Sequence, residues 1–417
     1  MIPAPHYAPD VRLAFGGGPA PALIRGALTE LRVQTGLEGV DRLELTLANE
    51  GLRFLDHPLF RLDTEVQVSI GYAPDDPALV FNGVVVGTDA TFPSESMPTL
   101  TVVAHDRRVR LQETSATRWF AIPIPKLAVL PLPDLLVAPA VALEHGLIPI
   151  LDPIGAALSV LVQGASVAAA IGDPDGMQKV VRKEHDQTNL EFLELVAREN
   201  GWEMLIEHAS EPAGYQLRFL SPLSHLDADV TLRYGASLID FLPKITRVGQ
   251  IAGIAVKVWR PEIKLELTIS VGWDWDRQSL QLGISPGFGM PGGLSGTTFM
   301  MVNEPVTLAS APRMIIAKLL PKLNRRLTAS GSCVGDPRIR AGGVLQVEGV
   351  GETYGGRYRI AGATHTLDGS GYRTAFDLRK EIWFGSIPPA SQGALTINGG
   401  LLTLDAQRSA ALQPTTP

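Results

Sequence analysis

The chain has 417 residues, of which 45% are hydrophobic and 19% charged, so it is too long for one compact core and we expect two to four domains. Its net charge of −7, with no basic run, argues against a surface that binds nucleic acid. The single cysteine, Cys333, excludes an intrachain disulfide and a cysteine-based metal cage. The first residues contain no apolar core, so we expect no signal peptide.

Residues 1–112 are predicted to form a first β domain. Apolar and polar residues alternate in short runs that are separated by turn residues, at 40–49, 64–72, 79–92 and 98–106. Short strands at even spacing are typical of a sandwich or a small barrel. The pattern therefore predicts an antiparallel β domain at the start of the chain.

Residues 113–235 change to a mixed pattern of helices and strands. A helical apolar pattern at 131–147 ends at Gly146. Two strands, 202–208 and 215–222, are expected to pair as a hairpin. This segment is predicted to be an α+β middle domain.

A second helix in the middle domain carries the clearest local signal of the chain. Thr188 and Glu191 form a T-x-x-E capping box, which satisfies two amide groups at the helix start. Gly201 stands where a left-handed residue commonly ends a helix. The spacing predicts that one face is buried: Leu190, Leu193, Val196 and Ala197.

An apolar insertion near 148–176 interrupts the middle domain. Its central part, 154–172, is nineteen residues without a charge, which is near the length of a membrane span. The segment is rich in Ala, Gly and Ser, has Gln163 at its centre, and has no Lys or Arg close to its ends. This weak hydropathy favours a buried or interfacial segment over membrane contact.

Residues 236–385 return to a β pattern and are predicted to form a second β domain. Strands are expected at 253–259 and 263–271, followed by a Gly- and Pro-rich loop at 283–296. A helix is expected near 311–327, with the preceding serine as its N-cap. Prolines within that segment limit its length.

The end of the second β domain repeats the course of the first. A strand at 344–350 is followed by an antiparallel hairpin at 356–379, with its turn at Asp368–Gly371. The first domain runs in the same order of strand, turn, strand, loop and strand, with Gly83 where Gly356 stands. We interpret this likeness as an internal duplication.

Residues 386–417 are low in charge and aromatics and are predicted to be a flexible tail. Within the tail, 394–404 contains short β-compatible runs around a Gly-Gly turn. A solvated tail has no need of large apolar residues, so we expect this part to order on a partner by adding a strand to an exposed edge. The candidate docking residues are Leu395, Ile397, Leu401, Leu402 and Leu404.

Two motifs match catalytic patterns by letter only. Segment 283–287 fits G-x-S-x-G, but Pro286 lacks the backbone N–H that must hold an oxyanion. Segment 287–292 fits G-x-G-x-x-G, but no helical pattern follows it to receive a dinucleotide. Asp274 and Asp276 are spaced as the polar face of a strand. We therefore expect no enzyme activity and no cofactor.

The eight histidines contain no H-E-x-x-H motif and no pair spaced for one metal ion. His105, His185 and His365 lie at predicted strand ends or loops, where a hydrogen-bonded structural role is the common outcome. We therefore expect no metal site.

Three segments together resemble the phage late control protein D and VgrG-type baseplate hub family of contractile tails and injection systems. They are 71–111 in the first β domain, 186–202 in the middle domain, and 356–380 in the second β domain. The resemblance implies a β-rich α+β fold, with two tube-like antiparallel β-barrels flanking an α+β middle domain. It also implies a homotrimer that joins a threefold spike to the sixfold inner tube and contacts the tube or its initiator and the baseplate wedge proteins.

Fused members of that family continue into the spike, whereas nothing after Phe384 could build one here. We therefore expect a separate spike protein that docks on the tail segment. The resemblance places assembly in the bacterial cytoplasm and the product in a virion tail or injection-particle baseplate. The alternative is a membrane- or envelope-active effector or translocation protein that uses segment 154–172.

Overall fold

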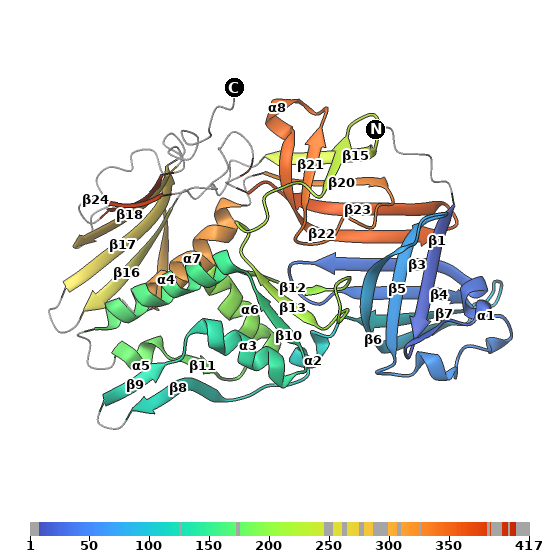
Figure 1. Cartoon of the computed structure of the whole chain (residues 1–417), viewed down its shortest axis with the longest axis horizontal. Coiled ribbons are helices and arrows are strands. Elements are labelled where there is room, and N and C mark those ends of the chain that lie inside the picture. The colour runs from blue at the N-terminus through green and yellow to red at the C-terminus, as the bar shows by residue number, and fades with distance from the viewer. Residues whose placement is uncertain are drawn as a thin grey trace.

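The computed structural model describes residues 8–124, 127–171, 176–245, 253–260, 265–274, 279–286, 299–306, 310–324, 327–381, 384, 394–398 and 401–405. The chain has a β-rich α+β fold, as expected from the sequence (Figure 1). The first and last β regions lie side by side, and the helices gather in a middle part between them and a separate small sheet (Figure 1).

The first β region surrounds one apolar core, to which alternate residues of each strand contribute. Its strands show the predicted alternation, so that Leu43, Leu45 and Leu47 are buried on one side of their strand. Its elements are β1 (Pro9–Phe15), β2 (Gly18–Pro19), α1 (Ala22–Ala27), β3 (Leu28–Gly36), β4 (Arg42–Ala48), β5 (Glu65–Tyr72), β6 (Ala78–Thr91), β7 (Thr99–His105) and α2 (Val109–Gln112).

The middle part packs helices against two three-stranded sheets. The predicted capping box is confirmed at the start of α6, and Gly201 ends that helix in the left-handed conformation, with φ of 69°. The predicted buried face of α6 is also confirmed. The elements are β8 (Arg118–Ile124), β9 (Leu127–Pro131), α3 (Asp134–Glu144), β10 (Ile148–Leu151), α4 (Pro153–Ala170), α5 (Gly176–Val180), β11 (Arg182–Glu184), α6 (Asn189–Asn200), β12 (Glu203–Glu207) and β13 (Gln216–Leu220).

The last β region forms its own core and carries the predicted hairpin. In β22, Tyr358 and Ile360 are buried, and a bulge at Ala361 then moves the buried positions to Ala363 and His365. The alternation of the first half of β22 therefore does not continue in phase beyond that bulge. The elements are β14 (Val230–Arg233), β15 (Leu238–Ile245), β20 (Leu327–Val334), β21 (Val344–Glu348), α8 (Gly351–Tyr354), β22 (Gly356–Asp368) and β23 (Gly371–Arg379).

A separate six-stranded sheet combines four strands that lie between β15 and β20 in the sequence with two strands from the tail segment after β23. Its strands pair among themselves in the order β19-β16-β17-β18-β25-β24, so the expectation that 253–271 joins the second barrel is wrong. The segment expected as a loop also differs, because residues 283–286 belong to a strand. The elements are β16 (Gly253–Arg260), β17 (Leu265–Asp274), β18 (Ser279–Pro286), β19 (Phe299–Val306), α7 (Ala311–Leu323), β24 (Ala394–Asn398) and β25 (Leu401–Asp405).

Candidate assembly surfaces

The first and last β regions contain the same five-stranded unit. In the first unit the strands lie in the order β3-β4-β7-β6-β5. In the second unit they lie in the order β15-β20-β23-β22, with β21 pairing the next edge of β22. All neighbouring strands within each unit are antiparallel. The two units therefore share one strand order.

The register of the two units is also the same. Val84 of β6 pairs with Glu65 and His105, and its counterpart Arg359 of β22 pairs with Val344 and Arg379. One strand of each unit then carries a bulge one residue further on, between Val85 and Gly87 in β6 and between Ile360 and Gly362 in β22. A bulge is a defined irregularity, so its recurrence at the same rung is strong evidence for duplication.

A second bulge recurs at the other side of the unit. The β3–β4 ladder shifts between Leu28 and Glu30, and the β15–β20 ladder shifts between Leu238 and Asp240. This register makes Tyr358, rather than Gly356, the counterpart of Gly83. The sequence comparison thus detected the repeat but aligned this strand two residues out of place, because it matched glycines and could not see the bulges.

The two units are joined within the chain by a ladder between β22 and β3. Residues 362–367 of β22 pair with residues 36–31 of β3, so both units belong to one 13-stranded sheet. The end of the second hairpin also packs against the first core, where the Tyr372 ring lies 5.7 Å from that of Tyr72. The β22–β3 ladder and the packing around it are here called the internal joint, which holds the two units side by side (Figure 1).

His365 lies within the internal joint and is fully buried. The hydroxyl of Tyr372 lies 2.8 Å from its Nδ1 atom. Burial, reinforced by the nearby Arg340, lowers the pKa of His365 to about 4. The side chain is therefore neutral at physiological pH, and its neighbours give it the packing role expected from the sequence.

Each half of the internal joint has a counterpart elsewhere that no strand covers in the described part of the chain. The half of β22 that pairs with β3 corresponds to residues 87–91 of β6. Beyond the bulge, the edge of β6 that faces β5 is unpaired. The counterpart of β3 is β15, which pairs with β20 on one side only. The molecule thus carries two open edges, here called the β6 edge and the β15 edge.

Both open edges carry exposed apolar side chains. Phe92, which directly follows β6, is 62% exposed, and Met97 in the same hairpin tip is also exposed. On the β15 edge, Leu242 is 65% exposed and Ile239 and Ile245 are exposed too. Unpaired backbone groups next to apolar side chains form a surface that favours pairing with another strand.

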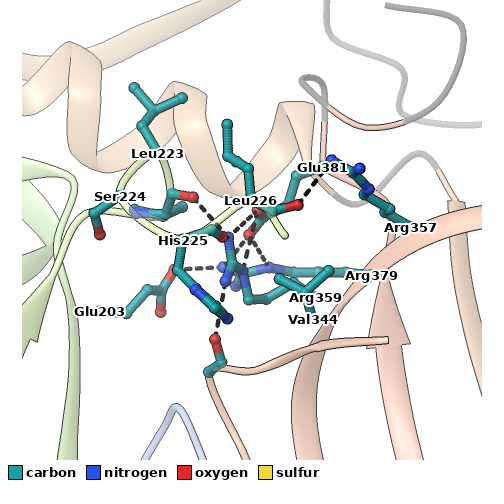
Figure 2. Close-up of polar contacts among 12 residues, drawn as sticks. Glu203, Leu223, Ser224, His225, Leu226, Val344, Arg357, Arg359, Arg379 and Glu381 are labelled. Atoms are coloured by element: carbon teal, nitrogen blue, oxygen red, sulfur yellow. Dashed lines mark hydrogen bonds and ion pairs between the residues drawn. The ribbon is translucent and has the colours of Figure 1, made fainter. Parts of the chain in front are cut away.

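A buried arginine fastens the second unit to the middle part (Figure 2). The Arg359 guanidinium donates to the backbone carbonyls of Pro222 at 2.6 Å and His225 at 2.8 Å, and to that of Gly342 at 2.9 Å. It also pairs with the Glu381 carboxylate at 3.2 Å. Because these groups come from separate segments, Arg359 fixes the loop after β13 against β22.

A second ion pair extends the same cluster. Arg379 lies 2.5 Å from Glu203 of β12 and 2.8 Å from Glu381 (Figure 2). Burial raises the pKa of the Glu203 carboxyl, although Arg379 and Arg359 oppose that rise. The first unit has an analogous fastening, in which the buried Asp41 contacts His208 of the middle part at 2.8 Å and the buried Arg108 donates to the Met204 carbonyl at 3.3 Å. Both units are thus tied to the middle part by buried charges.

The apolar insertion forms α4, whose polar side faces the protein. Ser159, Gln163 and Ser166 are buried. The Gln163 side chain accepts from the backbone N–H of Asp134 at 3.1 Å and donates to the Leu132 carbonyl at 3.3 Å. Among the described residues, no helix is long and apolar enough to cross a membrane.

The tail residues singled out from the sequence come together in a hairpin. Leu395 pairs with Leu404 and Ile397 with Leu402, while Leu401 lies opposite an asparagine. The strand β25 pairs with β18 of the same chain, so this part of the tail adds a strand to an edge of its own chain, whereas the sequence led us to expect the edge of a partner. Its apolar alternation is compatible with a strand, and β18 offers the backbone groups that complete it.

The remaining chemical motifs do not converge on a site. Residues 283–286 of the G-x-S-x-G match lie in β18, and Asp274 ends β17. Asp276 and segment 287–292 fall outside the described residues. In the described ranges no cluster of His, Cys, Asp and Glu could hold a metal ion. The edge residues, by contrast, were not singled out from the sequence, because exposed strand ends lack a local signature.

Comparison with known proteins agrees with this architecture. The structure is similar to the 43 kDa tail protein of prophage MuSo2 from Shewanella oneidensis, with a TM-score of 0.57 and 15% identity over 89% of this chain and 98% of that one. It is also similar to a tail protein from Neisseria meningitidis MC58, with a TM-score of 0.57 and 13% identity over 90% of this chain and 97% of that one. No family model and no curated protein sequence matches the chain. The chain therefore shares its fold with these two tail proteins.

Proposed function

We propose that the chain is the structural hub of the baseplate of a contractile phage tail or of a related injection system. The observation that carries this proposal is the repeat of one five-stranded unit, in the same register and with the same bulges, within a single chain. The likeness in fold to two phage tail proteins supports it. The role is structural, since the polar groups discussed above form packing and ion-pair contacts.

Three copies of a chain with two equivalent units place six units around one axis. Such a ring is threefold in its chains and nearly sixfold in its units. It can therefore meet a threefold spike on one side and a sixfold inner tube on the other. A chain with one unit would need six copies to do the same, and would then mismatch the spike.

The tail hairpin is the candidate contact with a separate spike protein. In the described residues β24 is the last strand of the six-stranded sheet, so its outer edge is unpaired. A strand of the spike could add to that edge through backbone hydrogen bonds. The docking residues inferred from the sequence all lie in β24 and β25.

Mass measurement of the hub mixed with the spike encoded beside it tests both parts of this function. We expect a complex with three hub copies for each spike trimer. A chain truncated after Gly385 should still fold but lose the spike. Undiminished co-purification of the truncated chain with the spike would rule out the docking role of the tail. A full-length complex with another number of hub copies would contradict the hub itself.

The membrane alternative rests on segment 154–172 alone. In the structure residues 154–170 of this segment lie in the helix α4, which turns its polar residues toward the middle part and uses Gln163 to hold α3. This arrangement gives the segment a packing role within the chain. We therefore keep the structural hub as the proposed function.

A further inference from the structure

We propose that the ring closes by pairing the β6 edge of one copy with the β15 edge of the next, in the register of the internal joint. This inference rests on the proposed hub function, since it names the contact by which the copies join. Each chain would then contain one joint and share two more, one with each of its neighbours, and all six joints of a trimer would be alike.

The register of the new joint follows from the internal one. In the internal joint Thr364 of β22 lies opposite Gln34 of β3. The counterpart of Thr364 is Asp89, because the two residues lie equally far along their strands from equivalent bulges. The counterpart of Gln34 is Lys244, because the two residues pair with equivalent positions of the neighbouring strand, β4 in the first unit and β20 in the second. The new joint therefore places Asp89 opposite Lys244 of the next copy.

This register brings an acidic and a basic side chain together. Asp89 and Lys244 are both exposed in the single chain. In the internal joint the backbone N–H of Leu37 donates to the Ala361 carbonyl at 3.0 Å. The pair of Leu37 and Ala361 is therefore hydrogen-bonded, and so is every second pair of opposite residues along the ladder from there. Asp89 and Lys244 fall on a rung between those bonds, where opposite side chains approach most closely. A one-residue shift would separate the two charges.

The apolar side chains of the edges also find a place. Phe92 is the counterpart of Leu367, which packs against the first core at the internal joint. In the new joint Phe92 lies opposite Phe241 of the next copy, a residue that packs against the second core. The exposed Phe92 would thereby cover the neighbour as Leu367 covers the first unit.

Pro243 limits the strength of the new joint. Its counterpart in β3 is Val33, which lies on a hydrogen-bonded rung of the internal joint. Proline has no N–H, so the new joint has one backbone hydrogen bond fewer at that rung. The proline nitrogen points away from β20, as an edge strand allows. This missing bond makes the joint between copies weaker than the internal one and consistent with assembly on the spike.

Charge exchange in the full chain tests the pairing. Asp89→Lys should place two lysines opposite each other, and Lys244→Asp two acids, so each variant should need at least about tenfold more protein to form the trimer with the spike. The double variant D89K/K244D should regain assembly. Glu352→Lys, an equal change of charge on the exposed α8, should leave assembly unaffected. Single variants that assemble like the parent chain, or a double variant that does not recover, would overturn the register.

Cross-linking separates this inference from the function on which it rests. In D89C/K244C, oxidation of the assembled particle should link chains into dimers and trimers and no larger species, since opposite residues on such a rung lie within disulfide reach. Cys333 is buried and does not compete. A particle with three hub copies on its axis but no cross-link would refute the joint and leave the hub function standing. A particle with another copy number would refute both.

Discussion

The two β units share strand order, register and bulges, but their edges differ. In the second unit, the half of β22 beyond the bulge is covered by β3, and its residues Ala363 and His365 are buried. In the first unit, the same half of β6 is largely exposed and is followed by the exposed Phe92. Two ladders with the same strand order and register can therefore differ in burial, one being covered by a further strand and the other exposed. The difference identifies the β6 edge as the place where we propose that a further copy binds.

The contacts that fasten each unit to the middle part differ between the two units, and a substitution there should have the largest effect on stability. Arg359 is buried and holds Glu381 and three carbonyls, whereas its counterpart in the first unit is the apolar Val84. Arg359→Ala should lower the free energy of unfolding by about 3–5 kcal/mol, because Glu381 loses a buried partner. Chemical denaturation measures this loss. Arg373→Ala, which alters an exposed arginine of the same hairpin, should change stability little.

The helix α6 lies in the middle part that both units share, so a core change there should affect the chain without favouring one unit. Leu193 is fully buried, and Leu193→Ala should lower the free energy of unfolding by about 2–5 kcal/mol. Glu194→Ala on the same helix is the control and should have little effect. Equal melting temperatures for the two variants would mean that the buried face has been assigned to the wrong side.

Acid should weaken the internal joint but not its counterpart edge. His365 has a pKa of about 4 in the folded chain, while its counterpart is Ala90, which cannot titrate. Because the pKa is lowered by folding, the unfolded chain binds more protons between pH 6.5 and 4, and stability falls as the pH is lowered. The loss over that range is on the order of 3 kcal/mol. Unfolding curves of His365→Gln should show a smaller loss over the same range; an unchanged pH dependence would exclude His365 as its source.

A single methyl group can test the smallest difference between the units. Gly83 lies in β6 where a Cβ would collide with the carbonyl of His105 and lie 2.8 Å from the Phe81 ring, whereas the counterpart Tyr358 is a large buried side chain. Gly83→Ala should lower the free energy of unfolding by about 1–3 kcal/mol through overpacking. Gly87→Ala at the bulge has no atom within 4 Å of the new Cβ and is the matched control. Equal stabilities would show that this strand has more room than its backbone suggests.

Local patterns in the sequence predicted the elements that depend on neighbouring residues. Thr188 and Glu191 marked the start of α6, and the pattern at 356–379 predicted an antiparallel hairpin, which the structure contains. Both signals arise from backbone geometry within a few residues. The like order of strands and turns in the two β domains also revealed the repeat, although without its register.

Long-range pairing could not be predicted in the same way. Nothing in residues 31–36 indicates that β3 meets β22 rather than another strand, since any alternating strand can pair with any other. The separate six-stranded sheet was missed for the same reason, because its strands look like those of a barrel. Asp89 and Lys244 are ordinary exposed residues, and only the bulges of the folded chain align them.

The most direct test of the account is an electron-microscopy reconstruction of the assembled particle, calculated without imposed symmetry. The account predicts three hub chains on the axis and a ring of six equivalent five-stranded units, with β6 of each chain beside β15 of the next. A ring whose units alternate between two unlike contacts would contradict the shared joint. Any number of hub chains other than three would contradict the account as a whole.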